Sequence, residues 1–511
     1  MAEQHANRNP SPVEADVCMV VEGTYPYVAG GVSSWAHDII RSLPDMKFSL
    51  LTILAPNTNL TPRYTIPENV VEIRHLFLAP FPAEKWTGFW HWNLFFDKLT
   101  SALLDFYARP GQESLARLIQ IINSRRSVLG WNRLMNSRQS WQMLLKMYQA
   151  MLPDGPFLDF FWTWRYLIGN LFVILLAEMP RARVYHAVST GFAGLFLARA
   201  HLETGRPVFV TEHGIYTNER RIEINMADWL YEKPRITLQV DHEERDVKTL
   251  WIESFQAYSL VCYQTSQQII TLYSGNQIFQ RADGADPKKM RIIPNGIHWE
   301  AFDKIQPEPD RLPTVALIGR VVPIKDIKTY IHACALLRAA VPNARALVLG
   351  PTDEDEGYFQ ECKQLIAHLK LEEMFQFTGR VKLTEYMSKI DINVLTSISE
   401  GQPLVILEAG AAGIPTVATD VGGCREMLEG LPDEDPPLGH AGIITRVSSP
   451  VDTAQALIRM LTDKERYAQY SHTIRARVKK YYGLDDLKNT YKNIYLGMCG
   501  QPTIKTGEKN A

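Results

Sequence analysis

Two glutamates eight residues apart give the strongest chemical signal in the sequence. Glu400 and Glu408 lie in the run SEGQPLVILEA, where Pro403 suits the first turn of a helix because its missing N–H costs little there. Glu400 would then precede the helix and Glu408 would lie within it. The free N–H groups of Leu404 and Val405 at the helix N-terminus would favour an anion.

Carboxylates beside an anion need cationic or hydroxyl partners, and a sugar nucleotide carries hydroxyls on both sides of its diphosphate. Glu400 would accept hydrogen bonds from the sugar, and Glu408 would accept them from the ribose. Spacing alone also allows a second interpretation, in which both are surface glutamates of an amphipathic helix.

Two cations follow a strand that the pattern predicts at 314–319. Arg320 and Lys325 stand in GRVVPIK, and a guanidinium and an ammonium on one loop can both reach a pyrophosphate. They can equally be solvated charges. No G-x-G-x-x-G follows a strand and no G-x-x-x-x-G-K-[ST] occurs, which disfavours NAD oxidoreductases and P-loop NTPases.

Hydrophobic periodicity predicts two series of alternating strands and helices, which is typical of open α/β sheets. The first series has strands at 17–21, 48–54, 70–76, 184–188, 207–211, 259–265 and 291–297, and helices at 30–43 and 191–202. The second has strands at 314–319, 345–350, 375–378, 392–396, 415–419 and 442–446. Its helices are expected at 326–340, 357–370, 384–390, 404–412, 424–429 and 451–462. The predicted fold class is α/β, with two doubly wound Rossmann-like domains facing a cleft that receives the ligand at the strand C-termini.

The domain boundaries are expected where the alternation of strands and helices is interrupted. We expect an N-terminal acceptor-side domain over 15–305, a proline-containing linker over 303–313 and a C-terminal donor domain over 312–480. A final helix within 481–500 is expected to pack back on the N-terminal domain.

A helical insertion over 81–178 interrupts the first sheet. It carries seven of the eleven tryptophans, at positions 86, 90, 92, 131, 141, 162 and 164. One interpretation is an embedded helical subdomain with an aromatic core. The other is a docking surface for a partner or an acceptor glycan.

Composition and local sequence features disfavour several classes of protein. The chain has 511 residues and a net charge of 54 − 56 = −2, so it lacks the broad basic footprint of a nucleic-acid binder. The polar N-terminus does not resemble a signal peptide. The twelve-residue apolar run 166–177 is too short to span a membrane and is interpreted as a buried core segment. The six cysteines have no zinc or redox spacing and are interpreted as small buried hydrophobes, so we expect a cytoplasmic protein.

The C-terminal half resembles a known family. The runs GRVVPIKD, FTGRV and SEGQPLVILEAGAAGIPTVATDVGGCREML are similar to those of family-4 retaining glycosyltransferases of the GT-B fold, over residues 314–480. In the N-terminal half, VEGTYPYVAGGVSSWAHDII and FVTEHGIYTNERRIEI resemble the subgroup that synthesises the Pel exopolysaccharide of biofilms. The resemblance implies a UDP-sugar donor, a polysaccharide acceptor and recruitment to inner-membrane proteins of the Pel complex, with no nucleic acid among the partners.

The resemblance also implies residue roles. Glu400 would contact the transferred sugar and His213 would face it, so these two are the expected catalytic residues. With the helix N–H groups included, the expected donor-binding residues are Gly30, Gly31, Arg320, Lys325, Arg380, Val381, Leu404, Val405 and Glu408. No cofactor and no metal are expected, because the acidic triplets 353–355 and 433–435 only superficially resemble a metal-binding D-x-D and are interpreted as solvated loops.

The sequence departs from the family pattern at two places, and it allows two other functions. Asp326 stands where the family often has glycine, and Gln402-Pro403 replaces a common Phe-Gly. A nucleotide-sugar epimerase of the same fold and a catalytically silent nucleotide-sugar-binding scaffold are the alternatives. The basic residues Arg475, Arg477, Lys479 and Lys480 are interpreted as a solvated helix face, or else as a contact for anionic lipid or an acidic partner.

Overall fold

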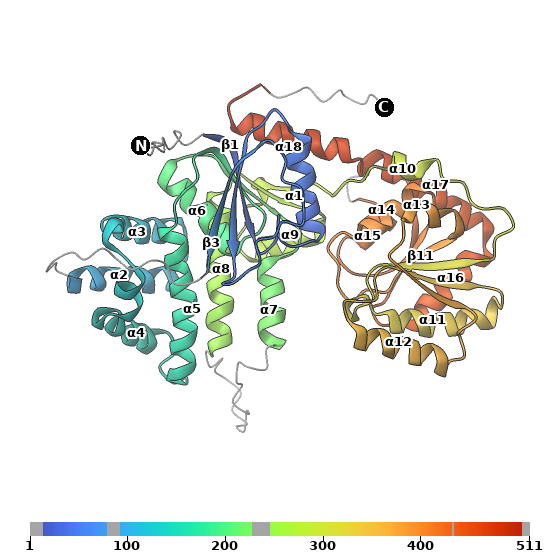
Figure 1. Cartoon of the computed structure of the whole chain (residues 1–511), viewed down its shortest axis with the longest axis horizontal. Coiled ribbons are helices and arrows are strands. Elements are labelled where there is room, and N and C mark those ends of the chain that lie inside the picture. Colours follow the sequence, from blue (N-terminus) through green and yellow to red (C-terminus); the bar gives the residue numbers. More distant parts are fainter. Residues whose placement is uncertain (1–13, 79–91, 227–245, 432–433, 503–511) are drawn as a thin grey trace, which may run out of the picture. The chain divides into compact units, whose positions relative to one another are not determined.

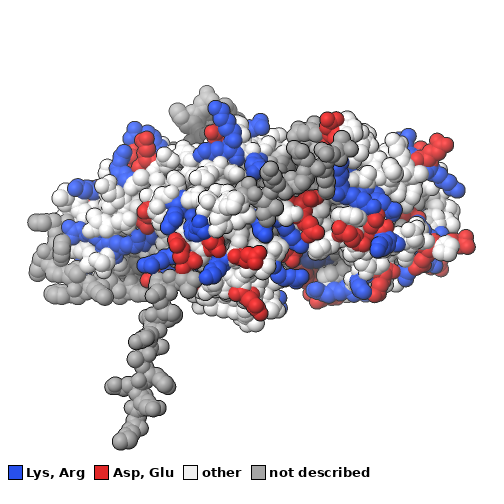
Figure 2. Space-filling model, turned by 90° about the horizontal axis from the view of Figure 1, so that it is seen from above, with Lys and Arg blue, Asp and Glu red and all other residues white. Residues whose placement is uncertain are grey.

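The computed structural model describes residues 14–78, 92–226, 246–431 and 434–502, which form two compact units (Figure 1). Unit 1 comprises Met1–Thr271, Gln277–Arg291 and Tyr491–Ala511, and unit 2 comprises Leu272–Asn276 and Ile292–Thr490. On the face drawn in Figure 2, basic and acidic side chains are interspersed, as the near-zero net charge leads one to expect.

Unit 1 is built on a seven-stranded sheet of order β3-β2-β1-β4-β5-β6-β7. Its strands are β1 (Ala15–Glu22), β2 (Phe48–Leu54), β3 (Val70–Phe77), β4 (Ala182–Ala187), β5 (Val208–Glu212), β6 (Gln268–Thr271) and β7 (Met290–Ile292). Its helices outside the insertion include α1 (Gly31–Ser42), α6 (Phe192–Thr204), α7 (Tyr216–Met226), α8 (Val247–Thr265) and, from Gln277 on, α9 (Ser274–Ala282). β1 pairs in parallel with both β2 and β4, so the strand order reverses between β1 and β4. The continuous apolar runs of β1 and β2 are buried on both faces, as central parallel strands require.

Unit 2 is built on a six-stranded parallel sheet of order β10-β9-β8-β11-β12-β13. Its strands are β8 (Thr314–Ile318), β9 (Arg345–Leu349), β10 (Phe375–Gly379), β11 (Ile392–Leu395), β12 (Thr416–Thr419) and β13 (Gly442–Thr445). Its helices include α10 (Glu300–Asp303), α11 (Ile327–Ala340), α12 (Glu356–His368), α13 (Leu383–Tyr386), α14 (Leu404–Ala411), α15 (Cys424–Glu429), α16 (Pro450–Thr462) and α17 (Lys464–Tyr481). Every strand predicted in this half is confirmed to within a residue, and the sheet order reverses between β8 and β11.

The helical insertion of unit 1 contains α2 (Trp92–Ala108), α3 (Gln112–Asn123), α4 (Arg138–Met151) and α5 (Phe157–Leu176). Figure 1 shows these helices beside α6 and α8, and their buried side chains share one hydrophobic cluster with the sheet. The described helices of the insertion therefore extend the core of unit 1. The apolar run 166–177 lies mostly in α5 with residues 167–175 buried, which confirms a core segment.

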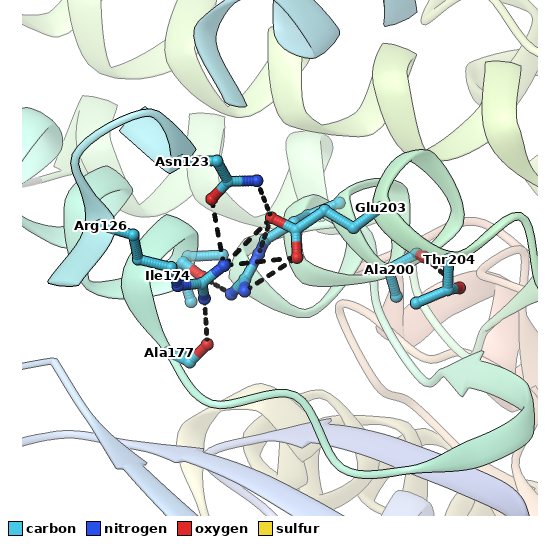
Figure 3. Close-up of polar contacts among 8 residues, drawn as sticks. Asn123, Arg126, Ile174, Ala177, Ala200, Glu203 and Thr204 are labelled. Atoms are coloured by element: carbon cyan, nitrogen blue, oxygen red, sulfur yellow. Dashed lines mark hydrogen bonds and ion pairs between the residues drawn. The ribbon is translucent and has the colours of Figure 1, made fainter. Parts of the chain in front are cut away.

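A buried ion-pair network fastens the insertion to the sheet layer (Figure 3). Arg199 on α6 is fully buried and donates to the Ile174 carbonyl at 2.7 Å and to Glu203. Arg126 also donates to Glu203 and reaches the Ala177 carbonyl at 2.7 Å. Because both guanidiniums share one carboxylate and find backbone carbonyls as well, their burial is compensated.

The tryptophans of the insertion divide between core and surface. Trp164 is buried, whereas Trp141 is 48% and Trp162 61% exposed. Trp86 and Trp90 lie outside the described residues. Within the part of the chain that the structure describes, no helix combines the length and apolar character needed to cross a membrane.

The structure corrects three expectations in the first half. The strand expected at 291–297 is β7, which ends at Ile292, and beyond it Ile297 forms an isolated bridge with Gly483. Residues 259–265 are not a strand but the last turns of α8, and the strand that follows is β6. The unit boundary lies at Ile292 and not within 303–313, because Phe302 and Ile305 pack in the core of unit 2. At the other end of the chain, α18 (Leu484–Met498) contributes Tyr495 to unit 1, where its hydroxyl lies 2.8 Å from His186 Nδ1.

Candidate functional site

The carboxyl edge of the unit 2 sheet brings Lys325 and Glu400 together. Lys325 follows β8 and Glu400 follows β11, the two neighbouring strands at which the order reverses. Lys325 Nζ donates to Glu400 Oε1 at 2.5 Å, and Ser397 Oγ donates to the same oxygen at 2.6 Å. Both charged side chains are mostly buried, so the loops after β8 and β11 are held at a fixed separation.

Arg320 has a different partner. Its Nη1 donates at 2.7 Å to Oε2 of Glu354, which lies on the loop after β9, and the arginine side chain is 56% exposed. The guanidinium is thus accessible, but a carboxylate already neutralises its charge.

The N-terminus of α14 supplies donors beside Glu400. Pro403 caps the helix without a side-chain hydrogen bond, and among the described residues no group accepts from the N–H of Leu404 or Val405. Glu408 lies one turn from the N-terminus of this short helix, on the side of the carboxyl edge. Its carboxylate has no hydrogen-bond partner in the described structure, and burial raises its pKa. Such a carboxylate is suited to accept from hydroxyl donors.

Glycines allow the loops at this edge to pack backbone against backbone. A Cβ on Gly350, after β9, would lie 2.0 Å from the carbonyl oxygen of Gly319, after β8. Gly422 has φ +55°, and a Cβ there would lie 2.3 Å from the carbonyl oxygen of Glu400. The loop that carries Glu400 is therefore fixed by close contact with the loop after β12.

The two departures from the family pattern have structural reasons. Asp326 has φ +45°, a left-handed conformation that glycine adopts freely and aspartate tolerates. Its carboxylate also accepts from Thr329 N at 3.2 Å and so caps α11. Gln402 is buried, and its Oε1 accepts from the N–H of Asn295 at 2.6 Å, so it holds the turn at 294–296.

Arg380 and Val381 lie after β10, two strands from β8. Arg380 is exposed, and Val381 packs partly against the cluster that contains Ile318 and Leu349. The structure places both at the same carboxyl edge as Lys325.

The remaining predicted residues lie in unit 1. Gly30 and Gly31 stand at the N-terminus of α1, and a Cβ on either would have no atom of another described residue, apart from its chain neighbours, within 4 Å. His213 directly follows β5, and burial lowers its pKa to about 4, so the imidazole is neutral at neutral pH. Its Nε2 is buried and has no hydrogen-bond partner among the described residues, and its ring centroid lies 4.7 Å from that of Trp35.

Sequence reasoning missed two buried carboxyls at the carboxyl edge of unit 1. Glu212, the last residue of β5, accepts from Tyr263 Oη at 2.6 Å and Gln280 Nε2 at 2.9 Å, and burial raises its pKa to about 7. Glu22, the last residue of β1, accepts from Tyr216 Oη at 2.7 Å, and burial raises its pKa as well. The sequence does carry a signal for both residues, because each is a glutamate at the end of an apolar strand. Burying a charge there costs free energy unless the carboxylate is hydrogen-bonded.

Residues of the two acidic triplets and of the basic cluster form ion pairs within unit 2. Arg477 is fully buried and pairs with Glu434 at 2.8 Å, and Lys479 pairs with Asp303 at 2.7 Å. The interpretation of a solvated basic face is therefore wrong for Arg477, and that of a solvated acidic loop is wrong for Glu434, which is buried with it. Asp433 lies outside the described residues. In the portion of the chain with described coordinates, no three His, Cys, Asp or Glu side chains are grouped as metal ligands, and all six cysteines are buried free thiols.

Solved structures support the fold of the whole chain. The structure resembles the Anabaena protein HepE in complex with UDP (TM-score 0.55, 14% identity, covering 93% of this chain and 98% of that one). It also resembles the sucrose-phosphate synthase of Thermosynechococcus elongatus (TM-score 0.55, 16% identity, covering 95% and 99%). The α/β class and the GT-B fold are thereby confirmed.

Sequence relatives match about a third of the chain. A D-inositol 3-phosphate glycosyltransferase of Stackebrandtia nassauensis is 30% identical over 201 residues, 36% of this chain and 44% of that protein. An N-acetyl-alpha-D-glucosaminyl L-malate synthase of Bacillus anthracis is 27% identical over 173 residues, 34% and 42% respectively. The chain thus spans less than half the length of these curated relatives.

Two protein families match successive parts of the chain. Residues 15–288 match the domain of unknown function DUF3492, and residues 299–477 match the glycosyl transferases group 1. The first match covers more than half of the chain and contains Gly30, Gly31 and His213, and the second contains Arg320, Lys325, Glu400 and Glu408. The chain therefore belongs to the DUF3492 family and carries a C-terminal domain of the glycosyl transferases group 1.

Proposed function

We propose that the protein is a retaining glycosyltransferase of the PelF type, which transfers a sugar from a UDP-sugar to a growing exopolysaccharide. The observation that carries the proposal is the Lys325–Glu400 pair at 2.5 Å, beside the unpaired N–H groups of α14. Cations and helix N–H groups suit a diphosphate, and a carboxylate among them suits sugar hydroxyls. The name of the Stackebrandtia relative, a glycosyltransferase, supports sugar transfer, and the UDP bound in the Anabaena structure supports this donor class.

The chemistry would depend on stabilising the leaving diphosphate. Lys325, Arg320 and the N–H groups of α14 would balance the negative charge that develops as the glycosidic bond to the diphosphate breaks. Glu408 would accept from the ribose hydroxyls, and Glu400 from hydroxyls of the transferred sugar. The transition state would resemble an oxocarbenium ion, and the departing phosphate would take the proton of the acceptor hydroxyl.

No metal takes part in this proposal. Treatment with EDTA should leave the transfer rate unchanged, and a loss of activity that Mn²⁺ restores would contradict the metal-free mechanism. The proposed partners are inner-membrane proteins of the Pel complex, and membrane fractionation with and without them would test that recruitment.

Calorimetry with a matched pair of variants tests the donor site. Lys325→Ala should weaken UDP binding at least tenfold, because a mostly buried cation is removed from the diphosphate. Lys328→Ala is the control, since Lys328 lies three residues further on and pairs with Glu361 at 2.6 Å on the surface of α11 and α12. Equal UDP affinity in both variants would show that Lys325 does not bind the donor.

A product assay separates transfer from the two alternatives. Incubation with a panel of UDP-sugars and oligosaccharide acceptors should release UDP in proportion to new glycosidic bonds. Interconversion of two UDP-sugars without UDP release would indicate an epimerase, and UDP-sugar binding without either reaction would indicate a scaffold.

A further inference from the structure

Two neighbouring hydroxyls at the end of β11 contact the two charged residues of the proposed donor site. Thr396 Oγ1 donates to the carbonyl oxygens of Lys325 at 2.9 Å and Asp326 at 3.0 Å. Ser397 Oγ donates to Glu400 Oε1 at 2.6 Å. Both hydroxyl residues are 1% exposed, so these hydrogen bonds are shielded from water. Thr396 thus holds the backbone of the lysine, and Ser397 holds the side chain of the glutamate.

The backbone of Ser397 is itself fixed on two sides. Its carbonyl oxygen accepts from Thr419 Oγ1, on the neighbouring strand β12, at 2.7 Å. The N–H of the next residue, Ile398, donates to the carbonyl oxygen of Ile324 at 2.9 Å. Because the chain is held both before and after the serine side chain, the hydroxyl keeps its position relative to Glu400.

The two oxygens of the Glu400 carboxylate differ in their partners. Oε1 accepts from Lys325 Nζ at 2.5 Å as well as from Ser397, whereas no described residue donates to Oε2. A carboxylate can accept about four hydrogen bonds, so Oε2 keeps its lone pairs for a ligand. The glutamate side chain is 13% exposed and is therefore not sealed from the solvent. Turning the carboxylate would break both hydrogen bonds to Oε1, so these two donors keep Oε2 in one orientation.

The lysine alone would not hold this orientation once a donor is bound. Its ammonium is a point charge on a flexible stem, and the diphosphate of the proposed donor competes with Glu400 for it. Ser397 carries no charge and is tied to β12, so its hydroxyl stays on Oε1 when the ammonium turns to the phosphates.

We propose that Ser397 is a positioning residue for sugar transfer. Its hydroxyl orients the Glu400 carboxylate so that Oε2 accepts from a hydroxyl of the transferred sugar while Lys325 Nζ contacts the diphosphate. This inference rests on the proposed function and deepens it, because it names a residue that acts on the sugar through Glu400 without touching the donor itself.

A double-mutant cycle tests whether Ser397 acts through Glu400. Ser397→Ala should lower kcat about 10- to 100-fold, the effect of one hydrogen bond to a charged group, and should leave UDP affinity within about twofold. It should also weaken binding of UDP-glucose or UDP-N-acetylglucosamine, whichever the protein transfers, relative to UDP. In the Glu400→Ala background the same serine change should have no further effect on either quantity, because the group that it positions is gone. The affinity measurement completes the cycle even where Glu400→Ala is too slow to assay.

Ser397→Cys separates the hydrogen bond from the packing of the side chain. Cysteine nearly preserves the volume of serine, but its S–H is a weak donor, so this variant should lose most of what Ser397→Ala loses. Activity close to that of the unaltered protein in Ser397→Cys would show that the alanine variant fails because of a cavity, and would overturn the proposal.

Ser388→Ala is the matched control. Ser388 lies just before β11, at the other end of the same strand, and its Oγ donates to Glu308 Oε1 at 3.1 Å. The control therefore loses a hydrogen bond of the same kind away from the carboxyl edge, and it should transfer sugar and bind UDP as the unaltered protein does.

Three further results would overturn the positioning role. They are equal losses of kcat with and without Glu400, equal losses of UDP and UDP-sugar affinity, and a Ser397→Ala variant that is unchanged in both measurements. A cycle that shows coupling in UDP-sugar affinity, although the unaltered protein transfers no sugar, would support the positioning role and contradict the proposed function.

Discussion

At the scale of single residues, the two cations of the proposed donor site are already paired. Lys325 holds Glu400 and Arg320 holds Glu354, so a bound diphosphate would have to exchange places with carboxylates. The two pairs differ in strength, because the first is mostly buried and the second is largely exposed to solvent. The exposed pair is the one that can be altered without disturbing the packing of the loops.

Glu354→Gln should therefore raise the affinity for UDP. The change frees Arg320 and removes a negative charge beside the diphosphate, and an exposed ion pair contributes about 0–1 kcal/mol, so we expect an increase of about 2- to 5-fold. Calorimetry at low salt measures it, and the gain should shrink at high salt because exposed charges are screened. Glu361→Gln, which breaks the Lys328 pair, should leave UDP affinity unchanged, and a weaker affinity in Glu354→Gln would show that Glu354 supports donor binding.

At the scale of elements, the second half of the chain was readily predicted from sequence. Its strands are short β-branched runs separated by amphipathic helices, and both periodicities are visible without knowledge of the tertiary structure. Residues 259–265 form part of a helix and not the expected strand, and a short buried apolar run such as Leu260–Tyr263 suits either element. Only its length, Val247–Thr265, distinguishes α8 from a strand.

The candidate site shows where prediction from sequence ends. Glu400, Lys325 and the N-terminus of α14 were predicted from spacing, since each is fixed by the strand or helix next to it. The pairing of Arg320 with Glu354 and the hydrogen bonds of Glu212 join loops that are far apart in sequence, and no local pattern encodes them. The Trp-rich insertion likewise gave no sign that its core would merge with that of the sheet.

Asp326 couples the loop that carries Lys325 to helix α11. Its left-handed conformation disfavours residues with a Cβ by about 1–2 kcal/mol, and its side-chain cap contributes about 0.5–2 kcal/mol. Asp326→Ala keeps the conformation and loses the cap, so it should lower the free energy of unfolding by about 1–2 kcal/mol. Asp326→Gly loses the cap but relieves the backbone and should cost less. Thermal unfolding together with hydrogen exchange in α11 measures both, and an alanine variant as stable as the glycine variant would contradict this explanation.

At the scale of the whole molecule, net charge conceals local electrostatics. The chain carries −2 overall, and Figure 2 shows mixed charges on its surface, yet unit 2 has cations at its carboxyl edge and unit 1 has buried carboxyls at its own. The two sheets share an architecture and differ in the ionisable side chains at their carboxyl edges. Unit 2 has the Lys325–Glu400 ion pair, and unit 1 has Glu212, whose pKa burial raises to about 7.

The stability of unit 1 should depend on pH through Glu212, which joins β5 to the β4 loop, to α8 and to α9. Burial raises its pKa to about 7 from about 4.5, so the folded protein retains a proton that the unfolded chain releases. The stabilising effect of this proton is complete below pH 4.5 and is lost as pH rises to 7, an amount of about 3 kcal/mol. His213 acts in the opposite sense, since its pKa is lowered to about 4 and its contribution to stability is lost as pH falls from 6.5.

The variant Glu212→Gln isolates the effect of the carboxyl group, because the His213 contribution is common to both proteins. The variant should gain stability relative to the unaltered protein between pH 5 and 7.5, measured by urea unfolding at each pH, whereas Glu373→Gln at an exposed position should show no such trend. A difference between Glu212→Gln and the unaltered protein that stays constant across this range would mean that Glu212 is already ionised at pH 5.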